Sequence, residues 1–436
     1  MSRDLAFLQS LTFDQHVDRY RSILGAHKDT LRWVVKAESK GQQLLTWFRE
    51  GQGVFWVTGK PGSGKSTLMK FIVDNPRTMK LLKQWAGPSH QIVIASHYFW
   101  YAGTPMQKSH EGLLRVLLYG IFKQCPNLIQ EICRSRWDQA EAATVWSLEE
   151  LQGVVQSLAS HPPAHLKFCL FIDGLDEYAG DHEEIAKILN DLAASSRSIK
   201  LCISSRPWNE FNMTFGRSTE RLVLHELTEN DIRAYTTSRL SNHQMWNVVS
   251  ARNPQTKSLI QLIVERAEGV FLWVFLVTNL LRNGLSNHDS ITDLYRRVES
   301  FPPDLERFFT QTLESVDPFY HKKMSAALNM ALHAPEPQNL SVYAFLEQEC
   351  EDPSYALSSS PPVEKDVHQQ HEDMKYRLNG WCKGLLEVHG ENVHVLHQTV
   401  ADFFKTAKMT RFLDDKIPSG FSVRLSLVKA CLALVK

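Results

Sequence analysis

Residues 59–67 combine residue types and spacing that suit the binding of phosphate groups. Gly59 and Gly64 are separated by four residues and followed at once by Lys65 and Ser66, which fits the pattern G-x-x-x-x-G-K-[ST] without deviation. Glycines let successive backbone N–H groups turn toward phosphate oxygens, and the N-terminus of a following helix adds positive charge. We expect Lys65 to reach the outer phosphates and the Ser66 hydroxyl to bind Mg²⁺. The residues predicted to bind the ligand here are Gly59, Pro61, Gly62, Ser63, Gly64, Lys65, Ser66 and Thr67.

A glycine-rich turn that binds nothing is the alternative interpretation of this motif. An apolar strand, VFWVT, precedes the motif, and an apolar helix, TLMKFIVD, follows it. Both flanking segments are those that a phosphate-binding loop requires, so the ligand-free interpretation is disfavoured.

Three carboxylates follow the apolar run FCLFID, where a buried strand should end. Asp173 closes the run, and Asp176 and Glu177 come shortly after it. A P-loop needs a second anchor for its metal, usually an acid at the end of a neighbouring strand, so we expect Asp173 and Ser66 to hold Mg²⁺. Carboxylates this close repel one another unless a cation or a polarised water lies among them, which favours Asp176 and Glu177 as catalytic residues. The alternative for these two is a solvated acidic loop that caps the next helix.

An arginine follows a third apolar run, IKLCISS. Arg206 would lie at the mouth of a parallel sheet, beside the P-loop and the acidic residues. A guanidinium there can reach a γ-phosphate, so Arg206 is a third candidate catalytic residue. An ordinary surface arginine that pairs with an acid is the alternative.

Short apolar runs alternate with amphipathic stretches between about Val54 and Leu224. This alternation predicts an α/β fold, with a parallel sheet covered by helices on both faces. From Thr228 to about Ser300 the pattern is helical, and VFLWVFLVTNLL predicts a buried helix rather than a membrane span, because 12 residues are too few to cross a bilayer. Residues 351–373, rich in Ser, Pro and acids, predict a surface insertion or mobile linker. The segment LLEVHGENVHVLH predicts a β-hairpin.

Composition indicates a soluble globular protein of several domains. The chain has 436 residues, with 48 basic and 48 acidic side chains, so we expect no general affinity for nucleic acid. Seven scattered cysteines without a CxxC pair favour reduced thiols and a cytoplasmic location. No segment is long and apolar enough to predict a membrane span.

The motifs GKPGSGKST, LFIDGLDEY and KLCISSRPW together resemble those of the NACHT class of STAND signalling NTPases, in the version found in large fungal NOD-like receptors. The small residue Gly174 after the first acid, followed by a further acid pair, is typical of this class. The resemblance implies a P-loop NTPase domain, a helical domain and a winged-helix domain. The implied boundaries are residues 1–29 for an N-terminal linker segment, 30–226 for the NACHT domain, 227–300 for the helical domain and 301–436 for the winged-helix domain.

The resemblance also implies a ligand set. It implies ATP or ADP with Mg²⁺, and it makes His397 the winged-helix histidine that contacts the β-phosphate of ADP. From the residue alone, a strand-end histidine bonded to backbone is the alternative. Gly269-Val270-Phe271 stands where relatives outside fungi often carry a proline against adenine, so GTP remains an alternative to ATP.

The function implied is a nucleotide-dependent switch with slow hydrolysis, acting in innate immunity or programmed cell death in a fungus. Such a switch self-associates on activation, and we expect its effector or sensor partners to be encoded outside this chain. Two alternatives come from other classes: a housekeeping P-loop ATPase or GTPase, and a scaffold in which the nucleotide only stabilises the fold.

Overall fold

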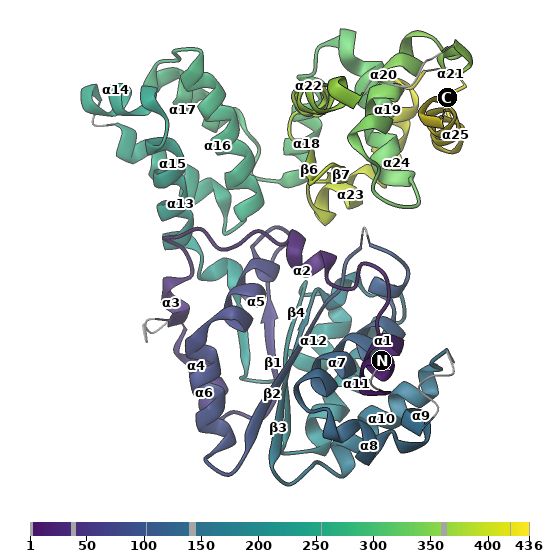
Figure 1. Cartoon of the computed structure of the whole chain (residues 1–436). Helices are drawn as coiled ribbons and strands as arrows, with labels where there is room; N and C mark the ends of the chain where they lie inside the picture. Colours follow the sequence, from purple (N-terminus) through teal and green to yellow (C-terminus); the bar gives the residue numbers. More distant parts are fainter. Residues whose placement is uncertain are drawn as a thin grey trace. The chain divides into compact units, whose positions relative to one another are not determined.

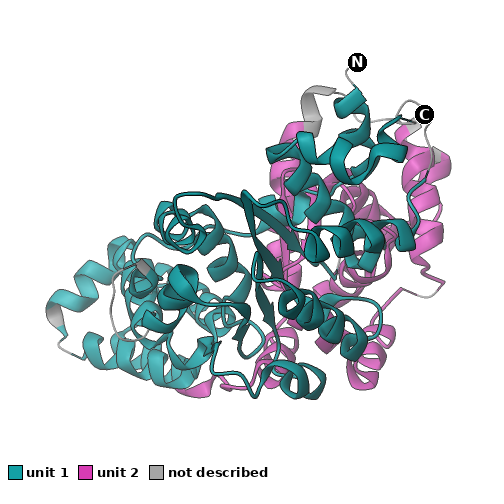
Figure 2. Ribbon diagram, turned by 90° about the horizontal axis from the view of Figure 1, so that it is seen from below, with its two compact units in different colours: residues 1–298 teal, residues 299–436 magenta. Residues whose placement is uncertain are grey.

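The computed structural model describes residues 3–35, 41–101, 103–138, 145–253, 255–358, 364–418 and 420–435. The chain divides into two compact units, Met1–Val298 and Glu299–Lys436, coloured separately in Figure 2. The first unit contains the predicted α/β domain together with most of the predicted helical domain.

A five-stranded parallel sheet forms the centre of the first unit, as the sequence predicts. Its strand order is β2-β3-β4-β1-β5, and every neighbouring pair is parallel. The carboxyl ends of all strands therefore lie along one edge of the sheet. The strands are β1 (Gly53–Thr58), β2 (Gln91–Tyr98), β3 (Leu166–Asp173), β4 (Ile199–Ser205) and β5 (Arg221–Val223).

Alternate side chains of the strands pack into two different hydrophobic clusters. In β3, Phe168, Leu170 and Ile172 join the cluster on one face, whereas Cys169 and Phe171 join the cluster on the other. A shift of register by one residue would exchange the two sets of side chains. The alternation therefore also determines on which face of the sheet the Asp173 side chain lies. Helices cover both faces, as Figure 1 shows.

The first cluster is covered by α7 (His110–Gln124), α8 (Asn127–Ile132), α10 (Leu148–Ser160), α11 (His182–Ser195) and α12 (Asn209–Phe215). The second is covered by α4 (Gln42–Glu50), α5 (Lys65–Asp74) and α6 (Pro76–Ala86). Short helices complete this part: α9 (Arg134–Asp138), η1 (Met106–Lys108), η2 (Leu175–Glu177) and η3 (Leu224–Glu226).

Where the structure describes them, the N-terminal residues predicted as a linker segment are helical and packed. They form α1 (Arg3–Leu11) and α2 (Asp18–Ser22), and α3 (Arg32–Val35) follows. Phe7 is fully buried, and its ring meets the rings of Phe122 and Trp146 edge-on, each at 5.6 Å between centroids. Phe7 and Leu11 are one helical turn apart, and the short amphipathic stretch that they define is stabilised by these tertiary contacts.

Five helices follow the sheet in the region predicted to be all-helical, and the last of them runs just past Val298, the end of the first unit. The apolar run predicted as a buried helix lies in α16, where Trp273, Val277 and Leu281 are fully buried. Among the described helices, none is long and apolar enough to cross a membrane. The five are α13 (Glu229–Ser241), α14 (Gln244–Arg252), α15 (Thr256–Ala267), α16 (Phe271–Ser286) and α17 (Ile291–Ser300).

Where the structure describes it, the second unit is helical apart from one hairpin. Strands β6 (Leu386–His389) and β7 (Asn392–Val395) are antiparallel, and Gly390 takes the left-handed φ of +63° that their two-residue turn requires. This is the hairpin that the sequence predicts. The helices are α18 (Leu305–Glu314), η4 (Pro318–Tyr320), α19 (His321–His333), α20 (Leu340–Glu351), α21 (Tyr355–Ser358), α22 (Glu364–Cys382), α23 (Gln398–Phe404), α24 (Ala407–Asp414) and α25 (Val423–Val435).

The predicted insertion at residues 351–373 is largely helical where the structure describes it. Tyr355 and Ala356 of α21 are buried, and residues from Glu364 onward belong to α22. Residues 359–363 of this prediction lie outside the described residues.

Candidate functional site

The loop between β1 and α5 has a backbone conformation that requires glycine at two positions. Gly62 and Gly64 have φ of +71° and +93°, values that side-chain-bearing residues rarely adopt. A Cβ atom on Gly62 would lie 2.7 Å from the Cβ of Leu272, and the Leu272 N–H donates a hydrogen bond of 3.0 Å to the Gly62 carbonyl. The loop is therefore packed against the start of α16.

The Lys65 side chain folds back onto this loop. Its Nζ donates to the carbonyl oxygens of Gly59 at 3.0 Å and Lys60 at 3.3 Å. Burial lowers the pKa of the Lys65 ammonium, and the carboxylate of Asp176 opposes that shift. The ammonium thus lies inside the turn, where phosphate oxygens would compete with two loop carbonyls for its protons.

Asp173 and Ser66, the two predicted metal ligands, lie close together at the carboxyl edge, and their binding of a metal stays a prediction. Burial raises the pKa of the Asp173 carboxyl, and hydrogen bonds from the hydroxyls of Ser204 and Ser66 counteract the rise. The Ser204 bond is 2.5 Å long and ends on Oδ1. Asp173 is 1% exposed, and among the described residues its Oδ2 has no hydrogen-bond partner.

Several polar atoms around this loop are buried and lack a hydrogen-bond partner among the described residues: Thr58 Oγ1, Ser63 Oγ, Tyr98 Oη and Asp173 Oδ2. Buried polar atoms are paired in most proteins, so a group of unpaired ones indicates a place where a polar ligand would supply the missing partners. Hydroxyl and carboxylate oxygens are the ligands that Mg²⁺ prefers. The residues present therefore fit a phosphate group and a magnesium ion.

Arg206 is held by one of the predicted catalytic acids. Its Nε lies 2.9 Å from Asp176 Oδ2, and its backbone N–H donates to Asp176 Oδ1 at 3.0 Å. Both side chains are largely buried, so the pair lies at the sheet edge rather than on an open surface. Arg206 thus pairs with an acid, as in the alternative interpretation, but it is not the surface arginine of that alternative. Contact with a γ-phosphate stays a prediction.

Glu177 is anchored on the other side of the acidic turn. Its Oε2 accepts a hydrogen bond of 2.7 Å from the Tyr101 N–H. Burial raises the pKa of Glu177 to about 8, and the nearby positive charge of Arg19 opposes the rise. Gly174, with φ of +70°, begins the turn that brings Glu177 close to the Tyr101 N–H.

Two residues of the site were missed by the sequence analysis. Ser204 fixes the Asp173 carboxylate, and its Oγ also accepts a hydrogen bond from the Gly174 N–H at 3.0 Å. Arg19 comes from the N-terminal segment and acts electrostatically on both Asp173 and Glu177. Ser204 could have been found from its place at the end of an apolar strand, whereas nothing near Arg19 in the sequence indicates its position.

His397 belongs to the second unit and starts helix α23. Its Nδ1 accepts a hydrogen bond from the Thr399 N–H at 3.0 Å, which caps the helix, and lies 3.0 Å from the Thr399 hydroxyl. This is the backbone-bonded histidine of the alternative interpretation. The predicted contact with a β-phosphate stays a prediction.

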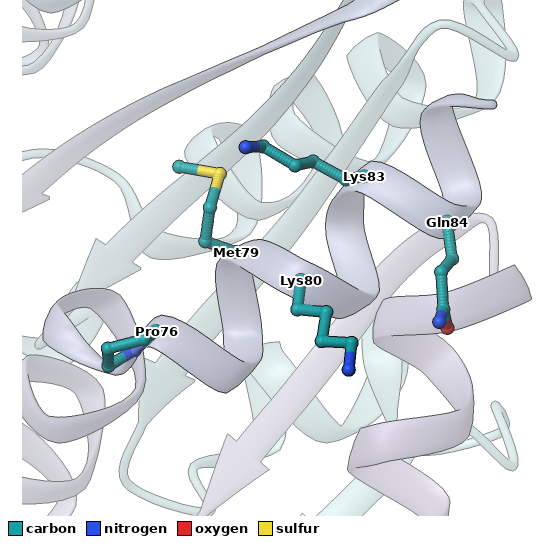
Figure 3. Close-up of a pocket in the computed structure, with 5 residues that line it drawn as sticks. All are labelled: Pro76, Met79, Lys80, Lys83 and Gln84. Carbon is teal, nitrogen blue, oxygen red and sulfur yellow. The ribbon is translucent and has the colours of Figure 1, made fainter. Parts of the chain in front are cut away.

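A surface hollow on α6 is unrelated to these residues. It is lined by Pro76, Met79, Lys80, Lys83 and Gln84, all from this one helix. Their side chains point in different directions rather than toward a common centre (Figure 3). We assign no ligand to it.

Comparison with known proteins gives two family matches and one curated relative. Residues 29–206 match the nephrocystin 3 N-terminal family, and residues 315–436 match a domain of unknown function (DUF7791). The chain is 25% identical over 393 residues to vegetative incompatibility protein HET-E-1 of Podospora anserina, an alignment that covers 87% of this chain and 26% of that protein. The chain thus spans about a quarter of its relative's length. These matches confirm the resemblance to NACHT-domain STAND NTPases of the fungal NOD-like receptor type.

Two solved structures share a weak overall likeness with the chain. The Drosophila ORC bound to DNA has 12% identity and a TM-score of 0.37, covering 92% of this chain and 90% of that one. Cdc6p from Pyrobaculum aerophilum has 14% identity and a TM-score of 0.35, covering 92% of this chain and 99% of that one. Likeness at this level supports no conclusion about this chain.

Proposed function

We propose that this chain, which resembles NACHT-domain NTPases, is a nucleotide-controlled signalling switch that binds ADP or ATP with Mg²⁺ and hydrolyses the triphosphate slowly. The observation that carries the proposal is the meeting of Lys65, Ser66 and the unpaired Asp173 Oδ2 around a glycine-rich turn. This set supplies a phosphate cradle and two oxygen ligands for a hard cation.

Each residue has a separate task in this proposal. The loop N–H groups and Lys65 bind the phosphates, and Ser66 with Asp173 holds Mg²⁺, which when bound neutralises charge on the phosphate oxygens. Ser204 keeps Asp173 aimed at that position. Glu177 orients a water for attack, and Asp176 holds the Arg206 guanidinium at the same edge of the sheet.

A switch requires that the two nucleotides favour different arrangements of the chain. In our proposal His397 contacts the β-phosphate of ADP and holds the second unit in a closed form. Exchange for ATP releases it and permits self-association in the cytoplasm. The name of HET-E-1 refers to vegetative incompatibility, which supports a role in non-self recognition or programmed cell death in a fungus.

Nucleotide binding by Lys65→Ala tests the proposal. We expect wild-type chain to bind ADP and ATP with micromolar or better affinity and to retain ADP through purification, whereas Lys65→Ala loses detectable binding because the phosphates lose their ammonium partner. Lys80→Ala, an exposed lysine on α6, is the control and should bind as wild type does. Isothermal titration calorimetry measures both. Micromolar affinity retained in Lys65→Ala, or fast turnover stimulated by a second substrate, would contradict the switch.

A further inference from the structure

The N-terminal segment crosses the carboxyl edge of the sheet as a strap, which we define as residues 14–23. At one end, the Gln107 side chain donates a hydrogen bond of 2.8 Å to the Gln15 carbonyl. At the other end, Lys70 Nζ donates to the carbonyls of Tyr20 at 2.9 Å and Ile23 at 2.7 Å. Gln107 belongs to η1 and Lys70 to α5, so the strap is fastened on both sides, and Figure 1 shows α2 beside the ends of the strands.

The middle of the strap is held by one aromatic side chain. The Tyr20 hydroxyl donates a hydrogen bond of 2.5 Å to Asp74 Oδ1, and its ring lies 5.4 Å from that of Tyr98, the last residue of β2. Lys70 Nζ lies 4.6 Å from the centroid of the Tyr20 ring. The backbone at Gln15 has φ of +65°, a strained value that these contacts maintain.

Arg19 precedes Tyr20 in the strap, and its positive charge acts on the acidic residues of the site. Its positive charge opposes the effect of burial on the pKa of both Asp173 and Glu177. Its Nε is buried and has no hydrogen-bond partner among the described residues. A buried guanidinium N–H left unpaired is costly, so this atom indicates a polar group that the protein itself does not supply.

We propose that Arg19 binds the terminal phosphate of a bound nucleoside triphosphate, so that the strap is held in place when that phosphate is present and loosened when it is absent. The inference rests on the nucleotide-binding function proposed above. Arg19 lies near enough to Asp173 and Glu177 to act on both electrostatically, and these acids are expected to hold Mg²⁺ and the attacking water beside the terminal phosphate. A guanidinium matches the geometry and charge of phosphate oxygens better than an ammonium does.

A comparison of triphosphate and diphosphate affinity tests this role. We expect Arg19→Gln in the full chain to weaken binding of Mg²⁺ with a non-hydrolysable ATP analogue by roughly tenfold or more, and to change ADP affinity by less than about threefold, because only the triphosphate reaches the guanidinium. Arg19→Lys should lie between the two. Arg21→Gln, an exposed arginine two residues along the same helix, is the matched control and should bind both nucleotides as wild type does.

Limited trypsin digestion gives a readout that does not depend on affinity. Cleavage after Arg21 should be slowed by the ATP analogue in the wild-type chain and unaffected by it in Arg19→Gln. Equal weakening of both nucleotides, or tighter Mg²⁺ binding in Arg19→Gln, would mean that Arg19 is only a counter-ion of the acids and would overturn the inference. A wild-type chain that binds neither nucleotide would instead refute the nucleotide-binding function. If Arg19→Gln does not fold, the same comparison of ATP-analogue affinity with ADP affinity is made for Arg19→Lys.

Discussion

Asp173 combines nearly complete burial with one unpaired carboxylate oxygen. Burying a carboxylate is unfavourable unless its charge is compensated, and the two serine hydroxyls that contact it compensate only in part, since its pKa stays raised. A divalent cation at Oδ2 would complete the compensation. The unpaired carboxylate oxygen of Asp173 is thus well suited to hold the metal.

Asp173→Asn should separate metal binding from nucleotide binding. The amide has nearly the same shape but no charge, so we expect the gain in triphosphate affinity on adding Mg²⁺ to fall by about tenfold or more. Affinity measured in EDTA should change little. Asp191→Asn, exposed on α11, is the control. An unchanged response to Mg²⁺ would exclude Asp173 as a ligand.

His97 makes the stability of the fold depend on pH. Burial next to Phe99 lowers the pKa of His97 to about 3, so the imidazole stays neutral in the folded chain while it protonates below about pH 6.5 when unfolded. The unfolded state then binds more protons, and the free energy of unfolding falls as the pH falls from about 6.5 toward 3, by about 1.4 kcal/mol per pH unit from this group.

His97→Leu should remove this contribution. Urea unfolding at several pH values is expected to give a shallower decline of the free energy of unfolding than in the wild-type chain, by roughly the slope above. His161→Leu, an exposed histidine, should leave the slope unchanged. Parallel slopes for wild type and His97→Leu would show that His97 already protonates in the folded chain.

The candidate site could be predicted from the sequence only where its residues follow strand ends. Lys65, Ser66 and Asp173 meet because parallel strands place their carboxyl ends at one edge. The pairing of Arg206 with Asp176 depends on how two turns fold against each other, so which acid pairs with Arg206 could not be predicted from the sequence. Arg19 lies more than 150 residues from Asp173 along the chain, so only the folded structure brings it near.

Strand β4 fastens helix α4 to the sheet through a buried lysine. Lys200 Nζ donates to the carbonyls of Trp47 and Phe48, at 2.8 and 2.9 Å, in the last turn of α4. It also lies 4.2 Å from the centroid of the Trp85 ring. A positive charge at a helix C-terminus is favourable, and it compensates the burial that lowers the pKa of Lys200 to about 8.

Lys200→Met should destabilise the first unit by about 2–4 kcal/mol, because two carbonyls lose a charged donor inside the core. Chemical denaturation followed by tryptophan fluorescence measures the loss. Lys167→Met is a close control, since Lys167 bonds the Trp85 carbonyl at 3.0 Å but is only partly buried. We expect a smaller effect there, and equal effects would argue against a special role for Lys200.

Helices and strands with a long regular pattern were the predictable part of the fold. The alternating strands of the sheet, the apolar α16 and the hairpin β6-β7 all appear where the sequence places them. The packing of helix α1 could not be predicted, because it depends on contacts with Phe122 and Trp146 far along the chain. The start of α22 within the predicted insertion was not foreseen either, since the polar composition of residues 364–373 hides the helical pattern.

The chain as a whole consists of two compact units, and every predicted phosphate-binding residue except His397 lies in the first. A chain of residues 1–298 should therefore bind both nucleotides by itself. If His397 contacts the β-phosphate, the full chain should bind ADP about tenfold more tightly than residues 1–298, since a charge-assisted hydrogen bond is added.

His397→Ser in the full chain is the matching variant. Serine keeps a side-chain acceptor for the start of α23 but is too short to reach a phosphate, so ADP affinity should fall to that of residues 1–298. His389→Ser, on the neighbouring hairpin, should have no such effect. Calorimetric titration compares all four chains, and equal ADP affinity throughout would refute a role for His397.

The hydrogen bond between the Gly62 carbonyl and the Leu272 N–H joins the P-loop directly to the first turn of α16. Any tilt of that helix must either pull on the peptide at Gly62 or break this bond. If a partner that binds the far end of α16 changes the affinity for nucleotide through this bond, thermodynamic reciprocity requires that nucleotide change the affinity for that partner by the same factor. A partner that promotes nucleotide exchange could therefore act by moving α16, without contacting the nucleotide.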